Sequence, residues 1–106
     1  MLKDADMPIV ELIRTTIREQ DPHAEIILYG SRARGEAHEG SDWDVIVLLN
    51  KPKLSFKERG NIGYTLWTKG FDAGEEINTF EFTKKEWEEA PLTMFKYNVM
   101  KEGIRL

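Results

Sequence analysis

The sequence predicts an α/β or α+β domain in which helices pack against a small β-sheet. Two patterns indicate this class. Residues 6–20 place apolar side chains at helical spacing, whereas residues 42–50 form an apolar run rich in β-branched residues, which is typical of a buried strand. Helix-like and strand-like segments alternate along the 106 residues, about the length of one small domain. We therefore expect a single domain over residues 1–106.

The first predicted helix, residues 6–20, carries its own start signal. Asp6 is a candidate N-terminal cap, and Pro8 suits the first turn, where the N–H that proline lacks would have no partner in any case. Its inner face should contain Ile9, Leu12, Ile13 and Ile17. Asp21 and Pro22 then end the helix.

The remaining elements follow in a regular order. Strands are expected at residues 25–30, 42–50 and 75–82. A short helical turn over 31–36 should join the first two strands. A second long helix is expected at 55–71, with an inner face of Phe56, Ile62, Leu66 and Trp67. In the last segment, residues 83–103, Thr83 and Glu86 form a capping-box pattern, and Pro91 should divide the segment into two helices.

Composition narrows the classes of function. Hydrophobic residues make up 41% and charged residues 32% of the chain, as in a folded domain. A net charge of −4 argues against broad nucleic-acid binding but permits a nucleotide bound through a metal ion. The lack of cysteine excludes a disulfide, a thiol nucleophile and a thiolate metal site. With no apolar run of about 18 residues and an acidic start unlike a signal peptide, we expect a cytoplasmic protein.

Two aspartates, Asp42 and Asp44, stand at the entry of the predicted strand 42–50. Because side chains alternate along a strand, both carboxylates should project from the same face. Two close carboxylates repel each other unless one is protonated or a cation lies between them. Mg²⁺ is typically held by one or two carboxylates together with substrate phosphates. The pair is therefore a candidate metal site, although a polar strand edge would show the same pattern.

A candidate phosphate site precedes the aspartates. Gly30 and Ser31 follow a predicted strand, where glycine allows a ligand to approach the backbone and free N–H groups attract an anion. Arg32 and Arg34 can pair with phosphate oxygens, and Ser41 precedes the aspartate pair. Each feature alone also fits an ordinary turn or a solvated surface. Together they predict phosphoryl or nucleotidyl transfer, with these five residues binding the nucleotide.

The stretch GSRARGEAHEGSDWDVIVLL, residues 30–49, resembles the signature of the DNA polymerase β-like nucleotidyltransferase superfamily. More narrowly, it is similar to the minimal nucleotidyltransferases of bacteria and archaea, which carry G-S-R-A-R-G followed by S-D-x-D. The resemblance implies a mixed sheet flanked by helices, with Gly30 and Ser31 on the phosphates and Asp42 and Asp44 on Mg²⁺. It also implies transfer of a nucleoside monophosphate from a nucleoside triphosphate such as ATP to a protein or small-molecule acceptor. Minimal members are often paired with a small helical HEPN-type partner in toxin–antitoxin modules; self-assembly is the other expectation.

The sequence differs from the family pattern at the third carboxylate, which active members of this family generally use. The stretch INTFEFTKKEW, residues 77–87, fits its usual context, but Asn78 occupies the place of the aspartate. Glu76 has the parity of Asn78 and is the candidate catalytic substitute beside Asp42 and Asp44; it also fits a solvated strand entry. Two functions therefore stay open: a Mg²⁺-dependent nucleotidyltransferase, or a degenerate module that binds a nucleotide or a partner without turnover.

Overall fold

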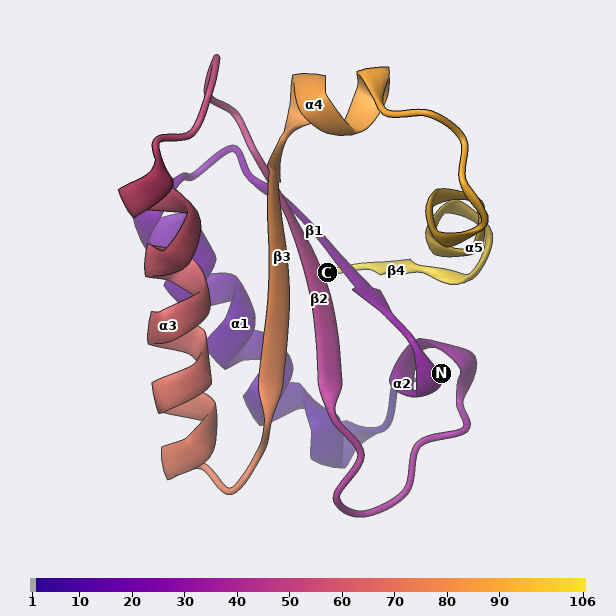
Figure 1. The fold of residues 1–106 in the computed structure, drawn as a ribbon. Coiled ribbons are helices and arrows are strands. Elements are labelled where there is room, and N and C mark those ends of the chain that lie inside the picture. The colour runs from indigo at the N-terminus through magenta and orange to yellow at the C-terminus, as the bar shows by residue number, and fades with distance from the viewer. Residues whose placement is uncertain (1) are drawn as a thin grey trace.

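The computed structural model describes residues 2–106, which form a four-stranded mixed sheet with helices on both sides (Figure 1). The strands are β1 (Glu25–Tyr29), β2 (Trp43–Leu49), β3 (Ile77–Thr83) and β4 (Ile104–Arg105). They lie in the order β3-β2-β1-β4. β2 and β3 are parallel, and the other neighbouring pairs are antiparallel. The predicted fold class is therefore confirmed.

The predicted helical segments are present. The helices are α1 (Met7–Gln20), α2 (Ser31–Arg34), α3 (Phe56–Asp72), α4 (Lys84–Glu89) and α5 (Met94–Glu102), and a 3₁₀ turn at Asp4–Asp6 precedes α1. The Thr83 hydroxyl accepts the N–H of Glu86, so the predicted capping box begins α4. The chain separates α4 from α5 around Pro91, where a helix would lose a hydrogen bond. None of the helices formed by residues 2–106 is long and apolar enough to cross a membrane.

One face of the sheet holds the main core. Along β2, Trp43, Val45 and Val47 point toward α1 and α3, whereas Ile46 and Leu48 point to the other face. Figure 1 shows α1 and α3 side by side against the sheet, with α4 and α5 lying apart from them. Each fully buried side chain of this size contributes about 1.5–3 kcal/mol. The alternation therefore fixes which face of β2 Asp44 occupies.

Two local expectations were wrong. On α3, Ile62 and Leu66 are buried, but Phe56 is 97% exposed and Trp67 is 47% exposed. Phe56 is the first residue of the helix, beyond the part that packs on the sheet, and Trp67 is one residue past the buried Leu66, which turns it outward. Asp6 does not cap α1 with its side chain; its carboxylate instead accepts the backbone N–H of Lys3 at 2.9 Å.

The second face of the sheet is only partly covered. Ile27, Ile46 and Leu48 pack there against Val99 of α5 in a smaller apolar cluster. The two-residue strand β4, which lacks a sequence pattern long enough to predict, follows α5 and pairs antiparallel with β1. Asp44 and Asn78 lie on this same face, at the end of the sheet where β1 ends and β2 and β3 begin. That end carries the predicted site.

Candidate active site

Gly30 is the first residue of the site, and the backbone conformation at this position requires glycine. It follows β1 with φ of 79°, in a region where side chains are strained, and its carbonyl accepts the N–H groups of Ala33 and Arg34 at 3.1 Å. A Cβ at this position would lie 2.8 Å from the Oδ2 atom of Asp44. The turn thus brings bare backbone up to a carboxylate on β2. Ser31 follows as the first residue of α2, which is a single turn.

The two aspartates differ in burial. Asp42 is exposed and lies just before β2, whereas Asp44 is half-buried within the strand, opposite Tyr29 on β1 and Asn78 on β3. Burial raises the pKa of Asp44, and the negative charges of Asp42 and Glu76 raise it further, against the opposing effect of a hydrogen bond from Asn78. The site therefore holds negative charge that its own residues do not neutralise.

Asn78 and Glu76, the two residues considered at the third-carboxylate position, lie around the start of β3. Asn78 is the register partner of Asp44, and its Nδ2 atom donates to the Oε2 atom of Glu76 at 3.2 Å. Glu76 is exposed and precedes β3, which begins at Ile77, while its carbonyl accepts the N–H of Trp43 at 2.8 Å. Within residues 2–106, no three His, Asp or Glu side chains are close enough together to hold a metal ion. The carboxylate of Glu76 thus contacts Asn78 and does not form a three-carboxylate metal site with Asp42 and Asp44.

These donors fit a divalent cation that also binds phosphate. Asp42 and Asp44 supply carboxylate oxygens, which hard cations prefer, and a cation would relieve the repulsion that raises the pKa of Asp44. The gap left by the missing Cβ of Gly30 faces the Oδ2 atom of Asp44. A side chain at this position would crowd that oxygen, so the close approach of the turn to Asp44 requires glycine. We therefore find the residue set compatible with Mg²⁺.

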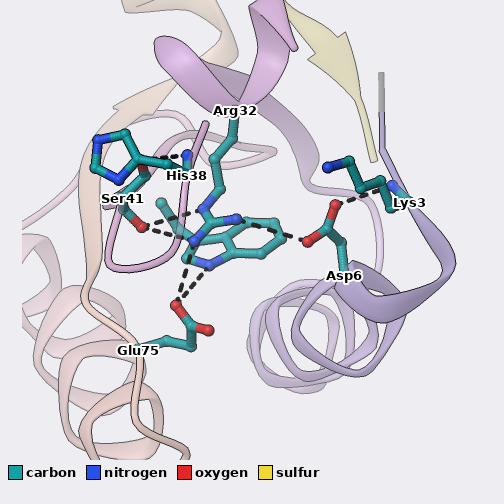
Figure 2. Close-up of polar contacts among 7 residues, drawn as sticks. Lys3, Asp6, Arg32, His38, Ser41 and Glu75 are labelled. Carbon is teal, nitrogen blue, oxygen red and sulfur yellow. Dashed lines mark hydrogen bonds and ion pairs between the residues drawn. The ribbon is translucent and has the colours of Figure 1, made fainter. Parts of the chain in front are cut away.

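The two arginines have different surroundings. Arg32, expected on a phosphate, has its guanidinium inside the fold, where it donates to the Ser41 carbonyl and stacks on Trp43 (Figure 2). Arg34 is exposed, and its guanidinium contacts the carboxylates of Glu36 and Glu102. Arg34 therefore remains open to solvent as a charged group near Gly30.

Ser41 lies in a tight loop before the aspartates. Its backbone N–H donates to the carbonyl of His38 at 3.0 Å, and its hydroxyl accepts the N–H of His38 at 3.0 Å. Its carbonyl accepts the Arg32 side chain through two nitrogens. The hydroxyl and carbonyl of Ser41 thus shape the loop that leads into Asp42.

An aromatic wall adjoins Asp44, and sequence reasoning missed it. The ring of Tyr29 lies 5.6 Å from that of Phe95 and 6.5 Å from that of Phe80, on the same sheet face as Asp44. Burial and the charge of Asp44 raise the pKa of Tyr29 to about 12, so its hydroxyl keeps its proton at neutral pH. Tyr29, Arg34 and Phe95 also line a cavity of 210 Å³ that reaches Gly30. Strand parity places Tyr29 there, but only the fold brings in Phe95.

Comparison with known proteins identifies the family. Residues 10–106 match the model of the nucleotidyltransferase domain. A chain of a toxin–antitoxin complex solved with AMP-PNP is 21% identical, with a TM-score of 0.64 over 92% of this chain and 70% of that one. A candidate nucleotidyltransferase from Sulfolobus solfataricus is 15% identical, with a TM-score of 0.62 over 92% and 76%.

A third solved structure, a mutant of the toxin–antitoxin pair MntA–HpeT, is 18% identical, with a TM-score of 0.62 over 92% of this chain and 70% of that one. No curated protein matches the sequence. At these identities the solved structures support the fold, whereas the family match covers nearly the whole chain. The chain belongs to the nucleotidyltransferase domain family.

Proposed function

We propose that this protein is a Mg²⁺-dependent nucleotidyltransferase that transfers a nucleoside monophosphate from a nucleoside triphosphate, with ATP as the candidate donor, to a protein or small-molecule acceptor. The main observation behind this proposal is the close approach of the Gly30 backbone to the carboxylate of Asp44. A backbone with no room for a Cβ lies against a carboxylate whose pKa is raised by burial and by Asp42. A turn that only glycine allows to come this close and unneutralised negative charge therefore occur at one point.

Each residue of the site has a separate role in this proposal. Asp42 and Asp44 would hold the metal ion, whose charge would offset that of the phosphates and of the pyrophosphate leaving group. Gly30 and Ser31 would bind phosphate oxygens through backbone N–H groups and the serine hydroxyl. Arg34, exposed near Gly30, would add positive charge once its contacts with Glu36 and Glu102 are exchanged for phosphate. Ser41 would contribute from the loop before Asp42.

The reaction needs a proton acceptor. An acceptor hydroxyl oxygen bonds to the α-phosphorus while the bond from that phosphorus to the bridging oxygen breaks, and pyrophosphate leaves with the electron pair. The hydroxyl proton must pass to a base or to water. Glu76 is the candidate base, since its carboxylate is exposed, lies on Asn78 and acts electrostatically on Asp44.

A second candidate function is nucleotide or partner binding without turnover. Asn78 favours it, because an uncharged amide is the register partner of Asp44 on β3 and cannot act as a base. The aspartate pair favours a site that binds a metal-bound nucleotide over one that binds only a protein partner, since a site with no cation to bind gains nothing from carboxylates that repel each other.

A protein partner is part of the proposal. Two of the similar solved structures are toxin–antitoxin complexes, which supports a protein partner. A small helical HEPN-type protein is the candidate acceptor. Large apolar side chains are also exposed on two helices of this chain: Tyr64, Trp67 and Phe71 on α3, and Met94, Tyr97 and Met100 on α5. Such side chains fit a protein interface, and a second copy of this chain is the alternative occupant.

Incubation with α-labelled ATP, Mg²⁺ and the product of the neighbouring gene tests the proposal. We expect label on the partner with wild type and none with Asp44→Asn, which keeps the shape of the side chain and removes its charge. Label that persists in Asp44→Asn would contradict the assigned metal site. Nucleotide binding without any transfer would favour the binding module.

Asn78→Asp separates the two functions further. It places a carboxylate at the third position, and general-base catalysis typically contributes about 10²–10⁴-fold. A binding module should begin to transfer label in this variant, whereas an enzyme that uses Glu76 should change little. Glu76→Gln is the variant matched to Asn78→Asp. Label transfer should be lost in Glu76→Gln only if the enzyme uses Glu76 as its base.

A further inference from the structure

The side chain of Arg32 is held by groups from four parts of the chain. Its exposure is 10%. The Nε and Nη2 atoms donate to the Ser41 carbonyl at 3.1 and 2.8 Å, and Nη2 also lies 3.4 Å from the carboxylate of Glu75. Nη1 lies 3.6 Å from the carboxylate of Asp6 (Figure 2). The guanidinium carbon lies 4.4 Å from the ring centre of Trp43, in a cation–π contact.

These contacts lie on both sides of Asp42. Arg32 donates to the carbonyl of Ser41, the residue before Asp42. It also stacks on Trp43, the residue after Asp42. Trp43 is fixed in turn, because its indole N–H donates to Glu75 at 3.2 Å and its side chain is 1% exposed. Asp42 itself is exposed and precedes the strand. Its position therefore depends on the two neighbours that Arg32 holds.

The same contacts make Arg32 a poor phosphate ligand. Each of its three nitrogens already has an oxygen partner, and two carboxylates balance its charge inside the fold. To reach a phosphate it would have to leave the Trp43 ring and leave Asp6 and Glu75 without their partner, at a cost for each partly buried charge. Arg34, two residues later, is exposed and pays no such cost.

We propose that Arg32 is a positioning residue, which holds Asp42 in place for the metal ion and does not bind the nucleotide. The inference rests on the proposed function, because it assigns Asp42 to a metal. It divides the two arginines of the GSRARG turn between two tasks: Arg32 orders the metal-binding loop, and Arg34 faces the phosphates.

Two binding measurements separate these tasks. The first is the affinity for Mn²⁺ in the absence of nucleotide, read from the electron paramagnetic resonance signal of free Mn²⁺. The second is the affinity for ATP in EDTA, measured by calorimetry. In Arg32→Ala we expect Mn²⁺ affinity to fall about 10–100-fold, as is typical when residues that orient metal ligands are removed. ATP affinity in EDTA should stay within about 2-fold, because no phosphate contact is lost.

Arg34→Ala is the matched control and should show the opposite split, with ATP affinity in EDTA falling more than Mn²⁺ affinity. Arg32→Lys distinguishes positioning from charge. Lysine keeps the positive charge but has neither the planar stack on Trp43 nor two nitrogens for the Ser41 carbonyl, so it should behave like Arg32→Ala. Without ligand, amide hydrogen exchange at residues 38–43 should also be faster in both Arg32 variants than in wild type.

The outcomes are separable. Wild type that binds neither Mn²⁺ nor ATP would overturn the proposed function itself. If wild type binds both, two outcomes would overturn only the positioning role. One is an Arg32→Lys variant that binds Mn²⁺ as wild type does; the other is an Arg32→Ala variant that loses ATP affinity in EDTA. If Arg32→Ala fails to fold, Glu75→Gln is the substitute, because it weakens the contacts of Glu75 with Arg32 and Trp43. An unchanged Mn²⁺ affinity in Glu75→Gln would overturn the inference.

Discussion

Two half-buried carboxylates on neighbouring strands, Asp44 on β2 and Glu81 on β3, invite comparison because both have a raised pKa. They lie on opposite faces of the sheet, and burial is the largest cause of the shift for each. A glycine also faces each of them: Gly30 approaches Asp44, and Gly63 of α3 approaches Glu81. By burial and by shape the two regions are alike.

Their charged neighbours differ. The N–H of Gly63 donates to the Oε1 atom of Glu81 at 2.7 Å, and Arg59 lies close enough to lower its pKa, so the helix and its arginine partly stabilise this charge. Asp44 instead has Asp42 and Glu76, which raise its pKa further. A carboxylate that the fold buries and also surrounds with like charge supports the proposed metal site, whereas Glu81 fits a role in joining α3 to β3.

The largest expected difference between the two regions is catalytic. In the proposed enzyme, Asp44→Asn should lower label transfer by at least about 10³-fold, since a metal ligand supplies several kcal/mol of charge stabilisation in the transition state. Glu81→Gln, the matched change on the other face, should leave transfer per folded protein within about 2-fold. Transfer rates and circular dichroism of both variants test the contrast, and an equal loss in both would remove the distinction.

The paired glycines should separate binding from stability. In Gly30→Ala, the new Cβ would meet Asp44 at 2.8 Å at a φ of 79°, so we expect ATP affinity to fall at least about 10-fold and stability to fall by about 1–3 kcal/mol. In Gly63→Ala, the Cβ would lie 2.7 Å from the Oγ1 atom of Thr79. Overpacking costs about 1–3 kcal/mol and alanine returns about 1 kcal/mol of helix propensity, leaving a net loss of about 1 kcal/mol.

Calorimetric ATP affinity and urea unfolding measure both glycine variants. Gly63→Ala should retain the ATP affinity of wild type, because Thr79 and Glu81 face α3, away from Asp44. A loss of affinity in this variant equal to that in Gly30→Ala would show that strain at α3 reaches the site. The two regions would then be coupled through β3.

Local sequence patterns predicted much of the fold and the sheet face on which Asp44 lies. The period-2 alternation of β2 placed Asp44 opposite the Trp43 core face, and the Thr83 capping box and the break at Pro91 were confirmed. These features depend on residues close together in the chain. Strand parity also accounts for Glu81, which has the opposite parity to Asn78 and faces Gly63 of α3.

Features that depend on distant residues were not predictable. The contacts of Arg32 with Glu75 and Trp43 join segments that only the completed sheet brings together, so no local pattern distinguishes Arg32 from Arg34. Periodicity likewise could not place Trp67, because a buried or an exposed aromatic fits the edge of a helical stripe equally well. The aromatic wall next to Asp44 needs Phe95 from α5, whose position depends on the turn around Pro91.

The smallest expected effect is the pH dependence of stability that Glu81 contributes. Since its folded-state pKa is raised, the fold favours the protonated form, so this contribution is full below the ordinary pKa of 4.5 and is lost as the pH rises through the raised value. Over that window, wild type should lose stability relative to Glu81→Gln, and the difference should then stay constant up to neutral pH. Urea unfolding midpoints between pH 4 and 7 measure it.

Glu86 provides a control, because its pKa is shifted in the opposite direction and Arg59 is a neighbour of both carboxylates. The backbone N–H of Thr83 and the guanidinium of Arg59 lower the pKa of Glu86, so its contribution is present above 4.5 and is lost as the pH falls through the lowered value. Glu86→Gln should therefore flatten the acid side of the stability curve, below the window in which Glu81→Gln acts. If both substitutions changed the slope in the same direction, the opposite pKa shifts of Glu81 and Glu86 would be wrong, and so would the raised pKa that Glu81 shares with Asp44.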